Sequence, residues 1–369
     1  MVVVLSVFGT RPEAIKMAPV IKELSRRDLV KSIVCMTGQH REIVTPILDL
    51  FGINPEYNLN VMEQNQTLSS LTSNLLSRLG PVVEGTKPDW VLAQGDTTSL
   101  LATALISYYH KVKFGHVEAG LRSHDKYRPY PEEMNRRLAD KLADAFFAPT
   151  EENRQTLINE GVPDEQILVT GNTVIDALTE LIDLPYDWQT SPLANLPTNK
   201  KIIVVTCHRR ESFGAPLQEI CLAIRDLAVR FPHYHIVYPV HVNPIVRKTV
   251  GETLSRRANL SLIEPLDYLS MINLMKRSKL ILTDSGGIEE EAVSLGIPVL
   301  VMRDITDRPE VLETGAARLV GTRREQIVDH TTQVLTNTSA YASMTNHANP
   351  YGDGKAATRI VSYLLDQSD

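Results

Sequence analysis

Cysteine and aromatic residues are scarce in this chain, whose 369 residues include 3 cysteines and 6% Phe, Trp and Tyr. Cys35, Cys207 and Cys221 are isolated and form no CxxC pair, which excludes a disulfide framework and a cysteine zinc site. Unpaired thiols fit a reducing compartment, so we expect a cytoplasmic location. The apolar segment Met1–Thr10 lacks a basic region and is too short to cross a bilayer. We therefore expect it to form a first β-strand, and we expect no membrane partner.

A net positive charge and the common cofactor motifs are also lacking. The net charge of −6 argues against a nucleic-acid partner, although a local cluster of arginine and lysine can still hold a small anion. The chain has no GxGxxG fingerprint for a dinucleotide, no GxxxxGK[ST] phosphate loop and no HExxH metal motif. We therefore expect no cofactor and no metal ion.

Apolar runs that alternate with helical patterns predict an α/β fold with parallel sheets. The chain is too long for one typical core. We predict a doubly wound, Rossmann-like domain over residues 1–183 and a second one over 201–354, joined by a linker rich in Pro, Asn, Thr and Ser over 184–200. A last helix within 355–369 can pack anywhere, including back on the first domain. Two such domains facing each other would form a cleft at the carboxyl ends of their strands.

The individual elements follow from short β-rich runs and longer helical patterns. Thr10 and Glu13 have the spacing of a capping box, with Pro12 in the first turn of the helix. The helices expected in the first domain include Glu13–Arg26, Thr67–Leu79 and Thr98–His110. Its expected strands are Val2–Val7, Lys31–Met36, Trp90–Gln94, Lys113–Val117, Ala145–Ala148 and Gln166–Val169. Those of the second domain are Lys201–Thr206, His235–Pro239, Leu260–Ile263, Leu280–Thr283, Pro298–Val301 and Ala317–Val320.

The segment from Leu280 to Ala292 predicts a phosphate site. An apolar strand ends at Ser285-Gly286-Gly287, where a helix begins. The backbone N–H groups of a helix start and its dipole both favour an anion, and glycines let the ligand approach closely. An arginine-bearing loop with Arg308 follows the next apolar run. The alternative is an ordinary strand-turn-helix unit in which Ser285 only caps the helix.

Polar residues follow six of the predicted strands. Any one of them has a plain structural alternative: Asp96 can cap a helix, His208 can be a solvated loop residue, and Gln39 can hydrogen-bond its own turn. Together they favour a ligand site, because all six ends are predicted on the same edge of their sheets. The groups after the strands are Arg11 with Lys16, Gln39 with His40, Asp96, Glu118, His208 with Arg209, and His241.

Seven motifs in chain order resemble those of the non-hydrolysing UDP-N-acetylglucosamine 2-epimerases of bacteria. The resemblance runs over nearly the whole chain and implies a glycosyltransferase-B-like fold. It also implies reversible conversion of UDP-GlcNAc to UDP-ManNAc in a cytoplasmic homodimer that supplies precursors for surface polysaccharides such as teichoic acid. The motifs are Val7–Lys16, Thr37–Arg41, Gln94–Thr98, His116–Arg122, Pro131–Arg136, Cys207–Glu211 and Asp284–Gly287.

The resemblance assigns roles to individual residues. It implies catalytic carboxylates at Asp96, Glu118 and Glu132, without deciding which acts on which face of C2, and a catalytic role for His208. Implied contacts to the substrate, with the second domain binding UDP, come from Arg11, Lys16, Ser285, Gly286, Gly287, Glu291 and Arg308. A second UDP-GlcNAc, acting as an allosteric activator, is implied at Gln39, His40, Gln66, Arg209 and His241.

The chemistry of the bond to be broken favours elimination. C2 of GlcNAc has no adjacent carbonyl, so its proton becomes removable once UDP leaves C1, and UDP then adds back to a glucal intermediate. Alternatives remain open at this point: a B-type glycosyltransferase, a hydrolysing UDP-GlcNAc 2-epimerase that releases free ManNAc, or a nucleotide-sugar-binding regulator without turnover. Analysis of the products formed from UDP-GlcNAc separates them.

Overall fold

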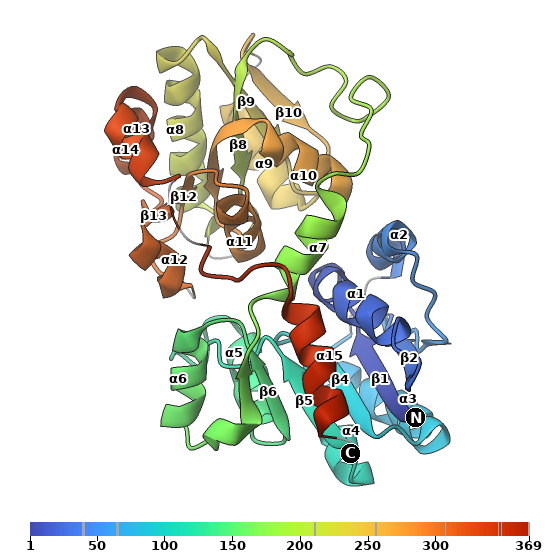
Figure 1. Ribbon diagram of the computed structural model, residues 1–369. Coiled ribbons are helices and arrows are strands. Elements are labelled where there is room, and N and C mark those ends of the chain that lie inside the picture. Colours follow the sequence, from blue (N-terminus) through green and yellow to red (C-terminus); the bar gives the residue numbers. More distant parts are fainter. Residues whose placement is uncertain are drawn as a thin grey trace. The chain divides into compact units, whose positions relative to one another are not determined.

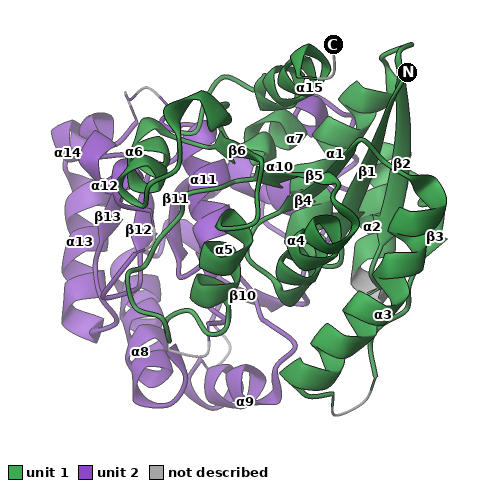
Figure 2. Cartoon of the chain, turned by 90° about the horizontal axis from the view of Figure 1, so that it is seen from below, with its two compact units in different colours: residues 1–179, 351–369 green, residues 180–350 purple. Residues whose placement is uncertain are grey.

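The chain forms two compact units, each with its own parallel sheet (Figure 2). Unit 1 comprises Met1–Thr179 and Tyr351–Asp369, and unit 2 comprises Glu180–Pro350. The computed structural model describes residues 1–38, 41–63, 66–209, 212–254, 257–306, 308–345, 347 and 349–367. Among these, no helix is both long and apolar enough to traverse a bilayer.

Unit 1 contains a seven-stranded sheet in the order β3-β2-β1-β4-β5-β6-β7. The order reverses between β1 and β4, which are neighbours and parallel, so this unit has a topological switch point there. The strands are β1 Val2–Phe8, β2 Val30–Met36, β3 Tyr57–Asn58, β4 Trp90–Gln94, β5 Lys113–Val117, β6 Ala145–Ala148 and β7 Ile167–Val169. All but the two-residue β3 lie within one residue of the prediction, and β3 is too short to have a periodic pattern.

Helices cover both faces of this sheet: α1 and α15 lie side by side on one face, and α3 and α4 on the other (Figure 1). Helix α3 passes through Gly80 and Pro81 and ends at Thr86, beyond the predicted end at Leu79, because Val82 and Val83 are buried in the core. The helices of unit 1 are α1 Arg11–Ser25, α2 Arg41–Phe51, α3 Leu68–Thr86, α4 Thr98–His110, α5 Glu132–Asp140, α6 Glu151–Asn159, α7 Thr173–Leu181, which runs into unit 2, and α15 Ala356–Asp366.

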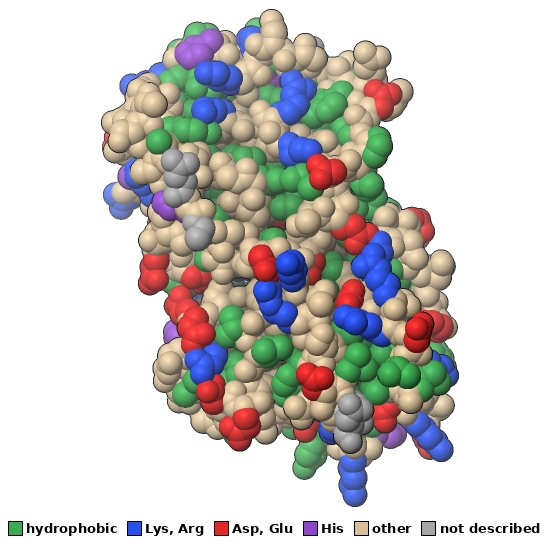
Figure 3. Space-filling view, in the orientation of Figure 1, with side chains coloured by type: hydrophobic (Ala, Val, Ile, Leu, Met, Phe, Trp, Pro, Cys, Tyr) green, Lys and Arg blue, Asp and Glu red, His purple; other side chains and the backbone are tan. Residues whose placement is uncertain are grey.

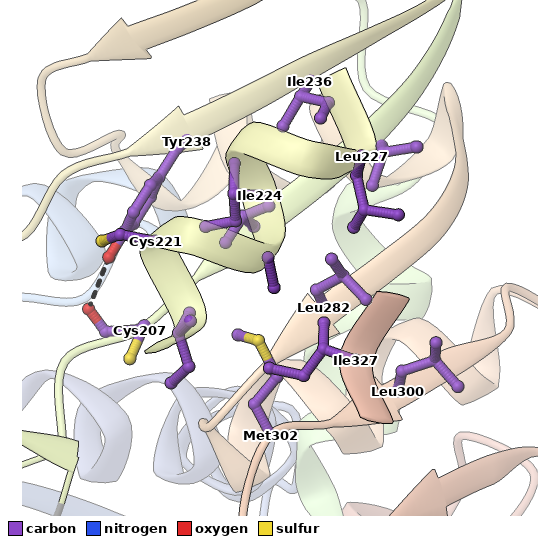
Figure 4. Close-up of a cluster of buried hydrophobic side chains, with 14 of the residues drawn as sticks. Cys207, Cys221, Ile224, Leu227, Ile236, Tyr238, Leu282, Leu300, Met302 and Ile327 are labelled. Carbon is purple, nitrogen blue, oxygen red and sulfur yellow. Dashed lines mark hydrogen bonds between the residues drawn. The ribbon is translucent and has the colours of Figure 1, made fainter. Parts of the chain in front are cut away.

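Unit 2 contains a six-stranded sheet in the order β10-β9-β8-β11-β12-β13, with its switch point between β8 and β11. Its core lies between the sheet and α8, where Figure 4 shows the Tyr238 hydroxyl donating to the carbonyl of Cys207 at 3.2 Å. The strands are β8 Lys201–Thr206, β9 Tyr234–Pro239, β10 Leu260–Ile263, β11 Ser278–Thr283, β12 Val299–Val301 and β13 Ala317–Leu319. The helices are α8 Ala215–Arg230, α9 Pro244–Thr253, α10 Tyr268–Lys276, α11 Gly286–Ser294, α12 Pro309–Thr314, α13 Arg324–Thr336 and α14 Thr338–Ser343.

The segment 184–200 differs from the predicted linker, because it packs within unit 2. Leu193 and Leu196 are buried, the Tyr186 hydroxyl donates to Ser270 at 2.8 Å, and the guanidinium of Arg277 lies 4.2 Å from the ring centroid of Trp188. Its polar composition reflects irregular backbone rather than a lack of contacts.

Helix α15 returns the chain to unit 1. The sequence left the placement of this last helix open, with packing on the first domain as one possibility. The carboxylate of Asp176 accepts the backbone N–H groups of Ala356 and Ala357 at 3.2 and 2.8 Å, which holds the start of the helix.

Charged side chains of both signs are intermixed on the face that Figure 3 shows. Two of the cations expected to contact the substrate, Lys16 and Arg308, are instead buried, with 6% and 7% of their surface exposed. Buried cations require a paired negative group, and these pairs define the candidate site.

Candidate active site

Asp96 and Glu118 lie at the same edge of the sheet in unit 1. Strands β4 and β5 are parallel neighbours that end in register at Gln94 and Val117, and the N–H of Gly95 donates to the carbonyl of Val117 at 3.1 Å. The two predicted carboxylates therefore follow adjacent strand ends. Asp96 also borders the switch point between β1 and β4, where open α/β sheets bind ligands.

Glu118 is held by three side-chain donors from three separate parts of the chain. Its carboxylate accepts from Lys16 of α1, from Gln94 of β4, and from the Asn172 amide at 2.7 Å. Its side chain is 8% exposed. The backbone of Glu118 has a φ of 68°, a strained conformation for a residue with a side chain, which occurs preferentially at functional sites.

Asp96 forms an ion pair with Arg136 of α5, with 3.7 Å between Oδ2 and Nη2. It is not the cap of α4, because Thr97 occupies that position and accepts from the N–H of Ser99 at 3.1 Å. The structural alternative weighed for Asp96 is therefore wrong. Its side chain is 35% exposed, which leaves it far more accessible than Glu118.

Glu132 is the first residue of α5, and the same helix contacts Asp96. The Asn135 amide donates to the Asp96 carbonyl at 3.0 Å, and Arg136 pairs with the Asp96 carboxylate. Residues three and four positions apart share a helix face, so Glu132 lies on the face of α5 that meets the β4–α4 turn. All three predicted carboxylates thus surround one region of unit 1.

The predicted capping box of α1 is present and reaches beyond its own helix. Glu13 accepts the N–H groups of Gly9 and Thr10 at 2.8 and 2.7 Å, and its other oxygen accepts the Thr97 hydroxyl at 2.5 Å. Burial raises the pKa of Glu13 despite these hydrogen bonds. The carboxyl group thereby connects the β1–α1 loop, with the exposed Arg11, to the turn that carries Asp96.

The phosphate site predicted from the sequence falls at the start of α11 in unit 2. Ser285 is the N-cap residue, but its side chain makes no capping hydrogen bond, so the alternative of a simple serine cap is wrong. A Cβ built on Gly286 would lie 2.5 Å from the guanidinium carbon of Arg308, whereas one on Gly287 would meet nothing within 4 Å. Arg308 donates through Nε to Glu290 at 2.6 Å. Glu291, one of the implied substrate contacts, is buried in the same helix.

Asp284 organises the loop that carries His208. Its carboxylate accepts the N–H groups of His208 and Arg209, both at 2.9 Å, and the Cys207 thiol and Ser212 hydroxyl, both at 3.2 Å. Burial and the Asp284 charge hold the pKa of the Cys207 thiol well above its ordinary value. Asp284 directly precedes Ser285, so one carboxylate joins the two loops at the β8/β11 switch point.

The residues expected to hold an activator are only partly described. Gln39 and His40 lie outside the described residues. Arg209 and His241 lie in unit 2 with His208, whose ring stacks on that of His241 with centroids 5.4 Å apart. Gln66 lies in unit 1, where its amide donates to the Val61 carbonyl at 2.9 Å.

Sequence reasoning assigned no role to five residues that complete these sites: Gln94, Arg136 and Asp284, which lie within the motifs, and Asn172 and Glu290, which do not. Asn172 follows β7, so the strand-end rule used for the other sites would have identified it. Glu290 lies four residues after Gly286 and so shares its helix face. Arg136 gives no such signal, because its contact with Asp96 depends on where α5 packs.

The two Rossmann-like units, each with polar groups at its switch point, define a protein of the glycosyltransferase-B-like class. The sequence profile of the UDP-N-acetylglucosamine 2-epimerase family matches residues 22–365. The chain is 51% identical to the UDP-N-acetylglucosamine 2-epimerase of Yersinia pestis over 98% of both chains. It therefore belongs to the UDP-N-acetylglucosamine 2-epimerase family, which makes it an isomerase.

Solved structures give the same result. The UDP-GlcNAc 2-epimerase of Neisseria meningitidis bound to UDP-GlcNAc has a TM-score of 0.93 and 46% identity, with 99% of this chain and 100% of that chain covered. The enzyme of Methanocaldococcus jannaschii in complex with UDP-GlcNAc and UDP has a TM-score of 0.84 and 33% identity, with 99% and 100% covered.

Proposed function

We propose that this epimerase is of the non-hydrolysing type and interconverts UDP-GlcNAc and UDP-ManNAc by elimination and re-addition of UDP. The observation that carries this proposal is the set of carboxylates at the β4 and β5 ends of unit 1, combined with the anion site at the start of α11 in unit 2. One set of groups suits proton transfer at carbon, and the other suits a departing diphosphate.

Unit 2 stabilises the leaving group, UDP. As UDP departs from C1, negative charge grows on its β-phosphate. Ser285, Gly286 and Gly287 supply backbone N–H groups at the positive end of a helix dipole, and Arg308 and His208 supply positive charge. Arg11 of unit 1 is a further cation for the diphosphate, and Glu291 accepts hydrogen bonds from the ribose.

Unit 1 supplies the carboxylates that transfer the proton at C2. Once the C1 bond weakens, a carboxylate removes the C2 proton to give 2-acetamidoglucal, and re-addition with protonation on the other face gives the epimer. Asp96, Glu118 and Glu132 are the candidates. Lys16 forms an ion pair with Glu118, while the more exposed Asp96 forms one with Arg136. Different surroundings for neighbouring carboxylates suit separate acid and base roles.

The test is turnover of UDP-GlcNAc by the pure protein in deuterated water. We expect deuterium at C2 of both epimers, and UDP-ManNAc as the accumulating product. Recovery of unlabelled UDP-ManNAc at high conversion would contradict elimination. Release of free ManNAc with UDP would instead indicate a hydrolysing enzyme, and turnover that requires a sugar acceptor would indicate a glycosyltransferase.

The proposal extends to the regulation of the enzyme and to the use of its product in the cell. The Neisseria relative is bound to UDP-GlcNAc, and we propose that a second UDP-GlcNAc activates this chain through Gln39, His40, Gln66, Arg209 and His241. Sigmoidal dependence of the rate on UDP-GlcNAc is the expected signature. We further propose a cytoplasmic homodimer that supplies ManNAc units for a surface polysaccharide such as teichoic acid.

A further inference from the structure

Asn172 connects the Glu118 carboxylate to the start of helix α7. It follows β7 and is buried. Its amide nitrogen donates to Oε1 of Glu118 at 2.7 Å, and its amide oxygen accepts the N–H of Val174 at 3.1 Å. The second contact is that of a helix N-cap, so one side chain both caps α7 and holds a proposed catalytic group. The structural alternative is that Asn172 serves only as the cap.

The backbone of Asn172 is held by the segment through which the chain returns from unit 2. Its N–H donates to the carbonyl of Tyr351 at 2.8 Å, and Tyr351 is the first residue of the returning part of unit 1. Gly171 permits this approach, because a Cβ there would lie 3.0 Å from the Tyr351 carbonyl oxygen and 3.3 Å from the Cα of Gly352. The two backbones therefore meet directly beside Asn172.

The contact continues along α7, the helix that carries the chain out of unit 1. The carboxylate of Asp176 accepts the first two N–H groups of α15, and a Cβ on Gly354 would lie 2.9 Å from the Thr179 hydroxyl oxygen. Asn172, Asp176 and Thr179 are spaced four and three residues apart, so they lie on one side of the helix and its cap. The outgoing helix and the returning segment thus run side by side within unit 1 (Figure 1).

We propose that Asn172 is a positioning residue that sets the Glu118 carboxylate, and that it makes this placement depend on the two segments that join the units. Lys16 contacts the same oxygen of Glu118 from α1, and Gln94 contacts the other oxygen from β4. Asn172 gives α7 and the returning segment their own direct contact with the carboxylate. Glu118 has a φ of 68°, a conformation that persists only where the surrounding structure imposes it. The inference rests on the proposed function through the catalytic role of Glu118.

Asn172→Ser separates capping from positioning, because serine caps helices about as well as asparagine but is too short to replace the amide nitrogen at Glu118. We expect kcat for epimerisation, expressed per folded protein as judged by circular dichroism, to fall roughly 10- to 100-fold, since a misplaced catalytic group costs rate steeply. Asn172→Asp also keeps a capping oxygen but places a second carboxylate beside Glu118, and should lower kcat further. Asn337→Ser is the matched control, because Asn337 caps α14 in the same way. Wild-type kcat in Asn172→Ser would overturn the proposal.

A double-mutant cycle shows whether Asn172 acts through Glu118. Glu118→Gln removes the carboxylate, so Asn172→Ser should have little further effect on kcat in that background. An effect of the same size in both backgrounds would show that Asn172 supports the fold without positioning Glu118, and would overturn the proposal. Wild-type turnover in Glu118→Gln would refute the catalytic role of Glu118 and this inference with it. The Kd for UDP should stay near that of the wild type, since its proposed contacts lie mainly in unit 2.

The dependence on the returning segment is tested at two glycines with nearly the same backbone. Gly171 and Gly161 have φ values of 88° and 87°, so alanine at either position carries similar strain, but a Cβ on Gly161 would meet no described atom within 4 Å. We expect Gly171→Ala to displace the Tyr351 carbonyl and lower kcat about tenfold, and Gly161→Ala to keep wild-type kcat. Equal kcat values for the two variants would overturn this dependence. Wild-type protein that fails to epimerise UDP-GlcNAc would instead refute the proposed function, before any variant is compared.

Discussion

Gly286 lies directly against the guanidinium of Arg308, at a distance that leaves no room for a Cβ: the nearest guanidinium atoms would be 2.5 Å away. A cation at the positive end of a helix is unfavourable by itself. Glu290 offsets part of that cost through its 2.6 Å contact with Arg308. The glycine thus allows an arrangement in which a helix start and an arginine attract the same anion.

This contact predicts that alanine substitutions at two adjacent glycines will affect UDP binding differently. Gly286→Ala should displace Arg308 and weaken UDP binding about tenfold or more, since one charge-assisted hydrogen bond contributes about 1.5–3 kcal/mol. Gly287→Ala is the control, because its Cβ would enter open space. Isothermal titration calorimetry with UDP measures both, and equal Kd values for the two variants would show that Arg308 does not contact the nucleotide.

The three carboxylates of unit 1 should affect turnover rather than nucleotide binding. Asp96→Asn, Glu118→Gln and Glu132→Gln are each expected to lower kcat by ~10²–10⁴-fold, the usual contribution of a general acid or base, while the Kd for UDP stays near that of the wild type. Glu84→Gln, on the exposed surface of α3, is the control. Initial rates of UDP-ManNAc formation test this, and a wild-type rate for any of the three removes that residue from the mechanism.

Asp284→Asn should detach the His208 loop from the start of α11. An amide replaces one acceptor oxygen with a donor, which then faces the N–H groups of His208 and Arg209. We expect unit 2 to lose about 1–3 kcal/mol of stability, which is the cost of unsatisfied buried polar groups. We also expect kcat to fall. Ser212→Ala removes a single donor from the same carboxylate and should cost less. Urea unfolding and kcat measure both, and equal stability of Asp284→Asn and wild type would contradict this account.

Glu160 should make unit 1 sensitive to acid. Its hydrogen bonds to Arg122 lower its pKa in the folded state. A carboxylate with a lowered folded pKa stabilises the fold above its unfolded pKa, and that contribution disappears as the pH falls through the folded pKa. Glu160→Gln should therefore reduce the free energy of unfolding at neutral pH, and the difference from wild type should shrink in acid.

Urea unfolding at neutral pH and at about pH 3, below the ordinary pKa of glutamate, measures this difference. Glu165→Gln removes the charge of an exposed carboxylate a few residues further along the chain and should show no such dependence on pH. A difference between Glu160→Gln and wild type that stays constant across this range would exclude the Arg122 pair as its source.

The sequence predicts the two sheets closely, because buried parallel strands are short apolar runs with abrupt ends. The same rule predicts which residues lie at the strand ends, including Asp96, Glu118 and Ser285. It does not predict what those residues touch. Gln94, Asn172 and Lys16 contact Glu118 from three segments that are far apart in the chain, and such contacts depend on packing. Composition alone is also a poor guide to packing in the segment 184–200. Its polar composition suggested a linker, but Leu193 and Leu196 pack into unit 2.

The return of α15 to unit 1 has a consequence for biosynthesis. Unit 1 is assembled from residues 1–179 and 351–369, with the whole of unit 2 between them. A ribosome therefore synthesises all of unit 2 before the segment that packs on α1 and pairs with Asp176 leaves the exit tunnel. Domains tend to fold in the order in which they emerge. Here the first unit to begin is the last to be completed, and its α1 surface stays uncovered during the interval.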